Sequence, residues 1–217
     1  MRVLVVAKSP VAGRVKTRLG SVIGLGAAAD VAAAALLDTL ETAAEAVGAE
    51  QCHLALAGEP GEAVRGREIR RLLAGWTVTS QRGDDFPARL AAAHLDAGTG
   101  PVAQIGMDTP QLRAADLERV FAELSDHDAV LGPAEDGGWW VLGRHDPQAA
   151  QWLAGVAMSQ PTTYDDTRAA LEAQDLLVGS TGTLRDVDTV ADAEAVAAAA
   201  PDSRFAQAWW DVAEVVA

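Results

Sequence analysis

Residues 2–20, RVLVVAKSPVAGRVKTRLG, contain the stretch that decides the fold. An apolar run at 2–7 has the composition of a buried β-strand, and it passes directly into a loop broken by proline and glycine. Lys8 and Lys16 are the only two lysines of the chain, and Arg14 and Arg18 add two more cations here. Open α/β sheets bind ligands at the carboxyl ends of their strands, where backbone N–H groups and cations hold anions. The stretch therefore predicts an α/β protein with a phosphate-binding loop after its first strand.

Two common phosphate-binding motifs do not fit this loop. A P-loop requires glycine directly before the lysine, whereas Arg14 and Val15 separate Gly13 from Lys16. The GLGAAA stretch at 24–29 has dinucleotide-binding spacing. It follows the loop 8–20, which contains the four cations and is called the basic loop below, rather than a strand. The sequence therefore predicts neither a P-loop nor a dinucleotide fold.

The rest of the chain alternates short β-rich runs with helical stretches. Strands are expected at 2–7, 52–57, 76–80, 101–106, 128–131 and 138–143, and helices at 26–47, 62–74, 86–97, 113–124 and near 163–174. A last helix near the C-terminus contains Trp209 and Trp210, which we expect to pack against the core. The alternation predicts right-handed βαβ crossovers and a mostly parallel sheet. No linker or repeat interrupts the pattern, so we expect one three-layer domain over residues 1–217.

Composition excludes several classes of partner. A net charge of −14 over 217 residues would repel nucleic acid and anionic membranes. Cys52 is the only cysteine, it lies in an apolar run, and we expect it to be a buried thiol in a reducing compartment. The sequence has neither a signal-peptide pattern nor an apolar run long enough to span a membrane. A cytoplasmic protein is the expectation.

The segment 102–112, VAQIGMDTPQL, places an acid directly after another apolar run. Asp108 is expected at a strand exit, because Pro110 stops the ladder there. An aspartate near a phosphate loop is suited to Mg²⁺, which takes one or two carboxylates together with substrate phosphates. Capping of the helix that begins near residue 113 explains the same aspartate equally well.

Two further acidic motifs also have two interpretations. The sequence 136–138, DGG, is typical of a hairpin turn, and its glycines would also permit the close approach of a ligand. In 185–196, RDVDTVADAEAV, acids at 186, 188 and 192 surround a strand-to-helix junction. Asp188 or Thr189 would cap the helix that follows. A second carboxylate ligand for a metal is the functional alternative.

Five motifs together resemble a known family. They are AKSPVAGRVKTRL (7–19), QRGDDFPARL (81–90), GMDTPQL (106–112), GPAEDGGWWVLG (132–143) and DVDTVADAEAV (186–196). They occur in the order seen in bacterial glycosyltransferase-A-like proteins of largely unassigned function. These proteins are related to the phospholactate guanylyltransferases of deazaflavin-cofactor biosynthesis and to the molybdenum-cofactor nucleotidyltransferases. The resemblance extends from residue 3 to about residue 196, and it implies the nucleotide-diphospho-sugar transferase fold.

The resemblance also implies site residues. The nucleotide would be bound by Ala7, Lys8, Pro10, Gly13, Arg14, Lys16, Arg18 and Gly106. One Mg²⁺ would be bound by Asp108 and Asp188, and the catalytic groups would be Lys8, Lys16 and Asp108. The chain departs from the family pattern at 84–87, 139 and 158. We therefore expect the acceptor near these departures, at Asp84, Arg89, Asp136, Gly137, Gly138 and Trp139.

Three functions are compatible with these motifs. A phosphorylated acceptor would attack the α-phosphorus of a nucleoside triphosphate and release pyrophosphate, a glycosyltransferase would use a nucleoside-diphosphate sugar, or the protein would bind nucleotide without chemistry. The basic loop favours the first, because cations stabilise the charge that develops on pyrophosphate. The expected partners are a nucleotide and a small acceptor, with a homodimer also considered.

Overall fold

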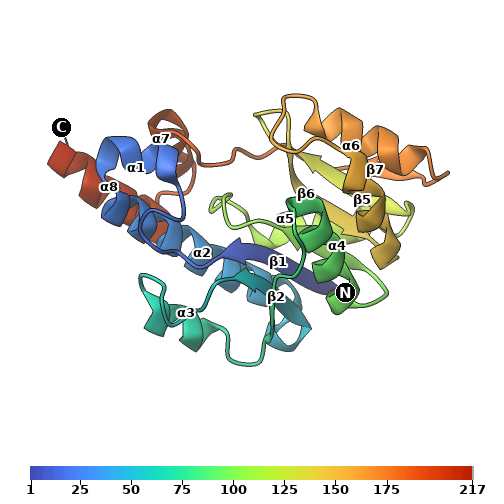
Figure 1. Cartoon of the computed structure of the whole chain (residues 1–217), viewed down its shortest axis with the longest axis horizontal. Coiled ribbons are helices and arrows are strands. Elements are labelled where there is room, and N and C mark those ends of the chain that lie inside the picture. The colour runs from blue at the N-terminus through green and yellow to red at the C-terminus, as the bar shows by residue number, and fades with distance from the viewer. Residues whose placement is uncertain (217) are drawn as a thin grey trace.

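The computed structural model describes the backbone of residues 1–216 and the side chains of residues 1–213. Seven strands form one sheet in the order β3-β2-β1-β4-β6-β5-β7 (Figure 1). Their bounds are β1 (Arg2–Lys8), β2 (Cys52–Ala57), β3 (Thr77–Ser80), β4 (Val102–Ile105), β5 (Ala129–Pro133), β6 (Trp139–Arg144) and β7 (Val178–Ser180). Every strand that the sequence predicts is present, within about two residues of its expected position.

The sheet is parallel except at β6. Strand β1 lies parallel to β2 and β4, and β5 lies parallel to β7. Strand β6 is antiparallel to both of its neighbours, β4 and β5. The prediction of a mostly parallel sheet is therefore confirmed, and the one reversed strand comes from the short β5–β6 hairpin.

Helices cover both faces of the sheet, which gives three layers (Figure 1). The α-helices are α1 (Thr17–Ile23), α2 (Leu25–Val47), α3 (Gly66–Leu72), α4 (Phe86–Ala97), α5 (Ala114–Glu123), α6 (Thr163–Glu172), α7 (Val190–Ala199) and α8 (Arg204–Val216), with 3₁₀ turns η1 (Ala49–Gln51) and η2 (Pro147–Gly155). The main core lies between one face and α2, α3 and α5. The other face packs against α4, η2 and α6. This architecture confirms the predicted α/β fold class.

A second layer of helices covers α2 on its outer side. Helices α1, α7 and α8 form a small core of their own with α2, and Figure 1 shows the three together at one end of the molecule. The Asp38 carboxylate on α2 accepts a hydrogen bond from the Phe205 N–H at 2.8 Å, which fixes the start of α8. Trp209 is buried in this core, as expected, but Trp210 is 43% exposed, so the expectation for Trp210 was wrong.

Local geometry explains where the helices differ from the expectation. Helix α3 begins at Gly66 rather than near residue 62, because Arg65 adopts a left-handed conformation with φ of 56°. The basic loop contains an unexpected helix, α1, which is separated from α2 by Gly24 at φ of 88°. Leu19 on α1 is buried in the small helical core, and this packing stabilises a seven-residue helix that propensity alone would not predict.

The amino edge of the parallel strands contains a buried cation, Arg144. Its guanidinium donates to His94 Nδ1 at 3.0 Å and to the carbonyls of His94 and Gly98 at 2.8 and 2.7 Å. Burial lowers the pKa of Arg144 to about 10, so the group stays charged at pH 7. Burial and the Arg144 charge lower the pKa of His94 to about 3, so the imidazole is neutral and accepts at Nδ1. Among the described side chains, no carboxylate pairs with Arg144.

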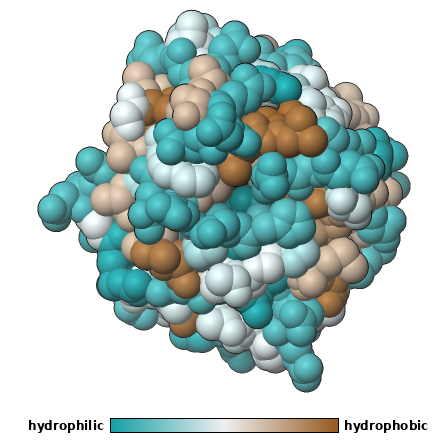
Figure 2. All heavy atoms as spheres, turned by 90° about the vertical axis from the view of Figure 1, so that its right-hand side faces the viewer, coloured by the Kyte–Doolittle hydropathy of each residue, from teal (hydrophilic) through white to brown (hydrophobic). Residues whose placement is uncertain are grey.

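The surface is mixed in character. Figure 2 shows the face toward α6 and β7, where apolar residues form separate small patches among hydrophilic side chains. Within the helices that the structure describes, none combines the length and the apolar character that a membrane span requires. Cys52 is buried, as the sequence indicates, and burial raises the pKa of its thiol to about 12.

Candidate nucleotide and metal site

A cleft of about 590 Å³ opens at the carboxyl edge of the parallel strands. This volume lies within the ordinary range for small-molecule sites. Its walls come from the β1–α1 segment, the segment after β4, the β5–β6 turn, the start of α4 and the segment before α7. Residues far apart in the sequence therefore meet in one place.

Strand directions explain why these segments converge. Strands β1 and β4 are parallel neighbours, so Lys8 and Gly106 lie at the same edge. Strand β6 runs the opposite way, so its first residue, Trp139, reaches that edge instead of its last. The Val187 N–H donates to the Asp108 carbonyl at 2.9 Å, which brings the segment 186–188 beside the exit of β4.

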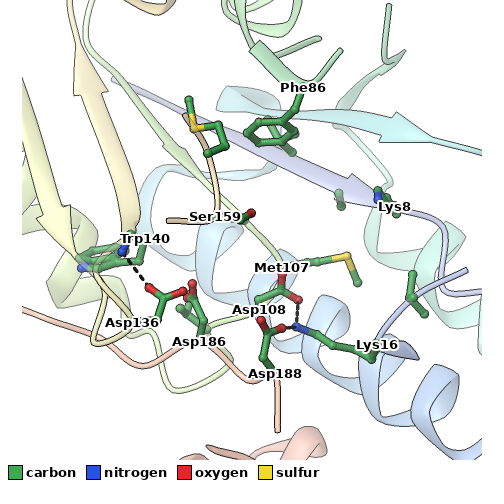
Figure 3. A pocket seen from close by; sticks show the side chains of 18 of the residues that line it. Lys8, Lys16, Phe86, Met107, Asp108, Asp136, Trp140, Ser159, Asp186 and Asp188 are labelled. Carbon is green, nitrogen blue, oxygen red and sulfur yellow. Dashed lines mark hydrogen bonds and ion pairs between the residues drawn. The ribbon is translucent and has the colours of Figure 1, made fainter. Parts of the chain in front are cut away.

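Lys16 occupies the centre of the most polar part of the cleft. Its Nζ lies 2.7 Å from Asp108 Oδ1 and 3.1 Å from Asp188 Oδ1, and its side chain is only 9% exposed (Figure 3). Lys16 is also the residue before α1 and has a left-handed backbone, with φ and ψ of 45°. This conformation is uncommon for a residue with a side chain and is found mainly where the surrounding structure enforces it.

The charges of this part of the cleft are strongly coupled. Burial alone would lower the pKa of Lys16, but the carboxylates of Asp108 and Asp188 outweigh burial and raise it, so the ammonium stays charged. Burial raises the pKa of Asp186 to about 7, and the charges of Asp108 and Asp136 contribute to the rise. Figure 3 shows Asp186 between Asp136 and Asp188. Asp186 is therefore partly protonated near pH 7, beside the Lys16 ion pairs.

The other cations of the basic loop are much less constrained. Arg14 and Arg18 are 70% and 79% exposed, and they lie 3.5 Å from Glu62 and 3.6 Å from Asp188. Lys8 is exposed at the end of β1, where it lines the cleft, and among the side chains of residues 1–213 it has no ion-pair partner. All four cations line the cleft. Three of them can therefore reach an anion without first breaking a buried contact.

The capping alternatives are settled by the hydrogen bonds at the helix starts. The N-cap residue of helix α5 is Arg113, whose N–H donates to Asp116 at 2.9 Å, so Asp108 does not cap the helix. Helix α7 is capped by Thr189 together with Asp192, and Asp188 takes no part as a cap. Asp108 and Asp188 are therefore free of a helix-capping role.

The wall formed by α4 and β6 has a different composition. Phe86 and Arg89 at the start of α4 line it, as do Trp139, Met158 and Ser159. Phe86 is 46% exposed, and the Trp139 indole N–H donates to Thr167 Oγ1 at 3.1 Å. Arg89 donates to the Gly83 carbonyl at 2.9 Å. This wall offers apolar surface with a single cation.

Four of the residues expected in the site do not line the cleft: Pro10, Gly13, Asp84 and Gly137. Asp84 lies in the loop before α4, and its neighbour Asp85 caps that helix by accepting from Ala88 N–H. Gly137 has φ of 89°, and a Cβ there would lie 2.1 Å from the Pro161 carbonyl oxygen. Gly137 therefore serves the hairpin and its packing rather than the approach of a ligand. The remaining expected residues line the cleft.

Three further residues line the cleft without a signal in the sequence that marks them. Asp186 was noted beside Asp188 but not chosen, and only its burial distinguishes it. Gln81 ties the ends of three strands together, because its side-chain N–H₂ donates to the carbonyls of Ala7 and Ala55 at 2.9 and 3.0 Å. Thr109 lines the cleft with a buried hydroxyl that has no partner among the described residues. No spacing signal in the sequence identifies these three.

The two carboxylates fit a metal ion that is held partly by the protein and partly by its substrate, rather than one held by protein ligands alone. Asp108 and Asp188 each place an oxygen on one cation, the Lys16 ammonium, so they converge on a single point. Within the described residues, no group of three or more histidine, cysteine, aspartate or glutamate side chains forms a metal site. Mg²⁺ is often held by one or two carboxylates and completed by substrate phosphates and water. The donor set present here matches that arrangement.

Solved structures of other proteins share this fold. A nucleotide-diphospho-sugar transferase-class protein of Desulfovibrio desulfuricans G20 matches with a TM-score of 0.82 at 23% identity, over 100% of this chain and 97% of that one. A CMP:2-keto-3-deoxy-manno-octonic acid synthetase complexed with CTP matches at 0.58 and 12% identity, over 93% and 99%. A Mycobacterium tuberculosis H37Rv protein in complex with manganese matches at 0.51 and 18%, over 90% and 97%. The chain therefore has the nucleotide-diphospho-sugar transferase fold, as the resemblance implies.

The chain belongs to the family described as "Uncharacterized protein conserved in bacteria (DUF2064)". The family model matches residues 39–160, which is more than half of the chain. The matched region includes Asp108 and the β5–β6 hairpin, but it excludes the basic loop and Asp188. No curated protein matches the sequence.

Proposed function

We propose that the protein is a divalent-metal-dependent nucleotidyltransferase that joins a nucleoside triphosphate to a small phosphorylated acceptor. The observation that carries this proposal is that four cations line one cleft together with two carboxylates that converge on Lys16. Anionic substrates are otherwise disfavoured by a chain with a net charge of −14. A local group of cations on such a background favours a highly charged ligand.

The reaction requires an oxygen of the acceptor to form a bond to the α-phosphorus of the nucleotide. The bond from that phosphorus to the bridging oxygen of the β-phosphate breaks, and pyrophosphate leaves with the electron pair. Lys8, Arg14 and Arg18 are placed to bind the β- and γ-phosphates and to offset the charge on the leaving group. Asp108 and Asp188 would hold Mg²⁺, or another divalent cation, against the phosphates. When bound, this cation supplies electrostatic stabilisation of the pentavalent transition state.

The α4–β6 wall is the proposed acceptor side. The apolar faces of Phe86 and Trp139 are suited to the body of a small organic acceptor, and Arg89 is suited to its phosphate or carboxylate. The wall is distinct from the phosphate-binding end, so the two substrates would approach from opposite sides of the cleft. This arrangement supports a direct transfer between them, without a covalent intermediate on the protein.

A glycosyltransferase is the second candidate. The observation in its favour is the match to the Desulfovibrio desulfuricans protein assigned to the nucleotide-diphospho-sugar transferases, which aligns over the whole chain. In that reaction the nucleoside diphosphate is the leaving group, and the acceptor attacks the sugar carbon. Lys8, Arg14 and Arg18, which are not held in buried ion pairs, favour the first candidate, because pyrophosphate carries more charge than the diphosphate of a nucleotide.

A substrate screen tests the proposal directly. The protein would be incubated with Mg²⁺ and each nucleoside triphosphate, or each common nucleoside-diphosphate sugar, in the presence of small phosphorylated acceptors. Release of pyrophosphate with formation of a nucleotidylated product would support the first candidate. Release of a nucleoside diphosphate with a glycosylated product would support the second, and binding without any product would support a non-catalytic nucleotide-binding protein.

A further inference from the structure

The two lysines of the chain lie in the same cleft and have opposite environments. Lys8 is exposed and without an ion-pair partner among the described side chains, whereas Lys16 is buried between two carboxylates. Both were assigned to phosphate binding from the sequence. A lysine that already holds two carboxylates within 3.1 Å is not available to a phosphate.

We propose that, in the absence of metal, the Lys16 ammonium occupies the position of the divalent cation, and that lysine and metal exclude each other there. The proposal rests on the proposed function, because it takes Asp108 and Asp188 as the metal ligands. Without metal, the ammonium offsets part of the negative charge of the two carboxylates. When a metal–nucleotide complex binds, Asp108 and Asp188 would hold the metal, and the released Lys16 would turn to the phosphates.

Geometry supports the exclusion. The two Asp oxygens lie 2.7 and 3.1 Å from Nζ, so the ammonium fills the space where a cation held by both Asp108 and Asp188 would have to lie. Figure 3 shows the ammonium beside both carboxylates, joined to each by a dashed line, with its stem approaching from the start of α1. A cation cannot be added to this point without displacing the lysine.

The backbone conformation also positions Lys16 for its contacts with the two carboxylates. Lys16 adopts a left-handed conformation at the residue before α1, and this conformation aims its side chain at the carboxylates. Asp188 is in turn held beside Asp108 by the Val187 N–H bond to the Asp108 carbonyl. Both the cation and its two partners are therefore positioned by main-chain structure.

The exchange has a consequence for the order of binding. Metal alone must replace a buried ammonium that makes two contacts, and it gains only two protein ligands in return. Metal together with a triphosphate gains the phosphate oxygens as further ligands, and the displaced Lys16 gains a new anionic partner. The ion pairs of Lys16 therefore disfavour the binding of metal alone and favour the binding of metal together with nucleotide.

Mn²⁺ binding in the absence of nucleotide tests the exchange, with the free ion followed by electron paramagnetic resonance. Lys16→Met removes the ammonium and keeps an unbranched side chain, so the variant should bind Mn²⁺ about tenfold or more tightly than the native protein. Lys8→Met is the matched control, since it removes the other lysine from the same cleft without freeing a carboxylate, and its Mn²⁺ affinity should match the native value. Asp108→Asn in the Lys16→Met background should cancel the gain.

A second measurement uses the native protein, so it does not depend on the folding of a variant. Selective ¹⁵N labelling of lysine gives side-chain signals from only two residues, because the chain has only Lys8 and Lys16. Saturating Mg²⁺ with a nucleoside triphosphate should move the Lys16 signal away from its ion-paired position. An unchanged Lys16 signal at saturation, or an unchanged Mn²⁺ affinity in Lys16→Met, would overturn the exchange.

The two failures are distinguishable. If Mn²⁺ binds the native protein with nucleotide through Asp108, but Lys16→Met gains nothing, the exchange is wrong and the proposed metal site stands. If Mn²⁺ binds neither the native protein with any nucleoside triphosphate nor the Lys16→Met variant, the metal site itself is wrong, and the proposed function fails with it.

Discussion

A buried cation lies at each end of the parallel strands, and the two cations are stabilised by different kinds of partner. At the amino edge, Arg144 is surrounded by neutral acceptors, namely backbone carbonyls and the Nδ1 atom of His94. At the carboxyl edge, Lys16 is held by the carboxylates of Asp108 and Asp188. Carbonyls of a loop have no alternative ligand to bind, whereas two carboxylates on a cleft can exchange one cation for another.

The difference teaches how to separate a structural charge from a functional one. Burial alone does not do so, because both cations are largely removed from solvent. The partners do: Arg144 closes the loop 98–100 and the end of α4, and its removal would leave several carbonyls without a donor. Lys16 has partners that are themselves charged and that line a cleft open to ligands.

The largest effect is expected from Asp108→Asn. Loss of one of two metal carboxylates should lower metal-dependent turnover on the order of a thousandfold, because the charge on the transition state is no longer offset. The melting temperature should change little, since Asp188 still pairs with Lys16. Turnover and melting temperature would be measured on the same preparation, with the exposed Asp126→Asn as a control. Intact turnover in Asp108→Asn would remove the carboxyl edge from the chemistry.

Arg144→Met tests the other edge. The variant should lose about 3 kcal/mol of unfolding free energy, because buried carbonyls and His94 lose their donor. Activity per folded molecule should be retained, since Arg144 lies at the opposite end of β6 from the cleft. Urea unfolding gives the free energy, and Arg144→Lys should be intermediate because it restores the charge with fewer donors. A variant that folds normally but loses turnover would erase the contrast between the edges.

Asp186→Asn tests how the raised pKa of Asp186 affects the pH dependence of stability. In the folded protein the pKa of Asp186 is about 7, above its ordinary value of 3.8. The folded state therefore retains a proton that the unfolded state loses, and this residue's contribution makes stability fall as the pH rises from about 4 to 7. The asparagine variant should lack that fall and should exceed the native protein by on the order of 2 kcal/mol at pH 8. Unfolding free energies at pH 5 and 8 check this, and parallel pH profiles would contradict it.

The smallest effect is expected from Trp139→Ala. Loss of one aromatic face should raise the KM for the acceptor about tenfold or less, because such contacts contribute about 0.5–1.5 kcal/mol. The KM for the nucleotide should stay unchanged, since Trp139 lies on the wall opposite the basic loop. Steady-state kinetics with each substrate varied in turn would separate the two, and Trp139→Phe should retain most acceptor affinity. A rise in the nucleotide KM instead would exchange the roles of the two walls.

Local sequence patterns were sufficient for most of the fold. Apolar runs and helical spacing located six of the seven strands and most helices, because they report burial directly, whereas the short edge strand β7 was not predicted. Helix α1 was not predicted, since Leu19 is stabilised by α8, which is distant in the sequence. Trp210 was expected to pack against the core but is exposed. Two adjacent residues of a helix point in different directions, and which of them meets the core depends on how α8 packs against the rest of the chain.

The candidate site was predicted in part. Asp108 and Asp188 were predicted because each follows a β-rich run, and Lys16 because both lysines lie in the loop after the first strand. The structure brings the three together. Their direct pairing was not foreseen, because it depends on the left-handed backbone of Lys16 and on the path of residues 184–188 across the edge. Asp186 and Thr109 were not selected, because their burial depends on neighbours from other parts of the chain.

The hairpin that forms one wall also limits where the chain can change in length. Trp139 and Trp140 are consecutive on β6, so one packs on the α6 face of the sheet and the other on the α5 face, where Trp140 lies against Gly132. A strand shifted by one residue presents every side chain to the wrong face. Surface loops usually tolerate insertions, but a single residue added to the connection 134–138 would exchange the two indoles between opposite sides of the sheet. This short turn should therefore accept substitutions more readily than insertions.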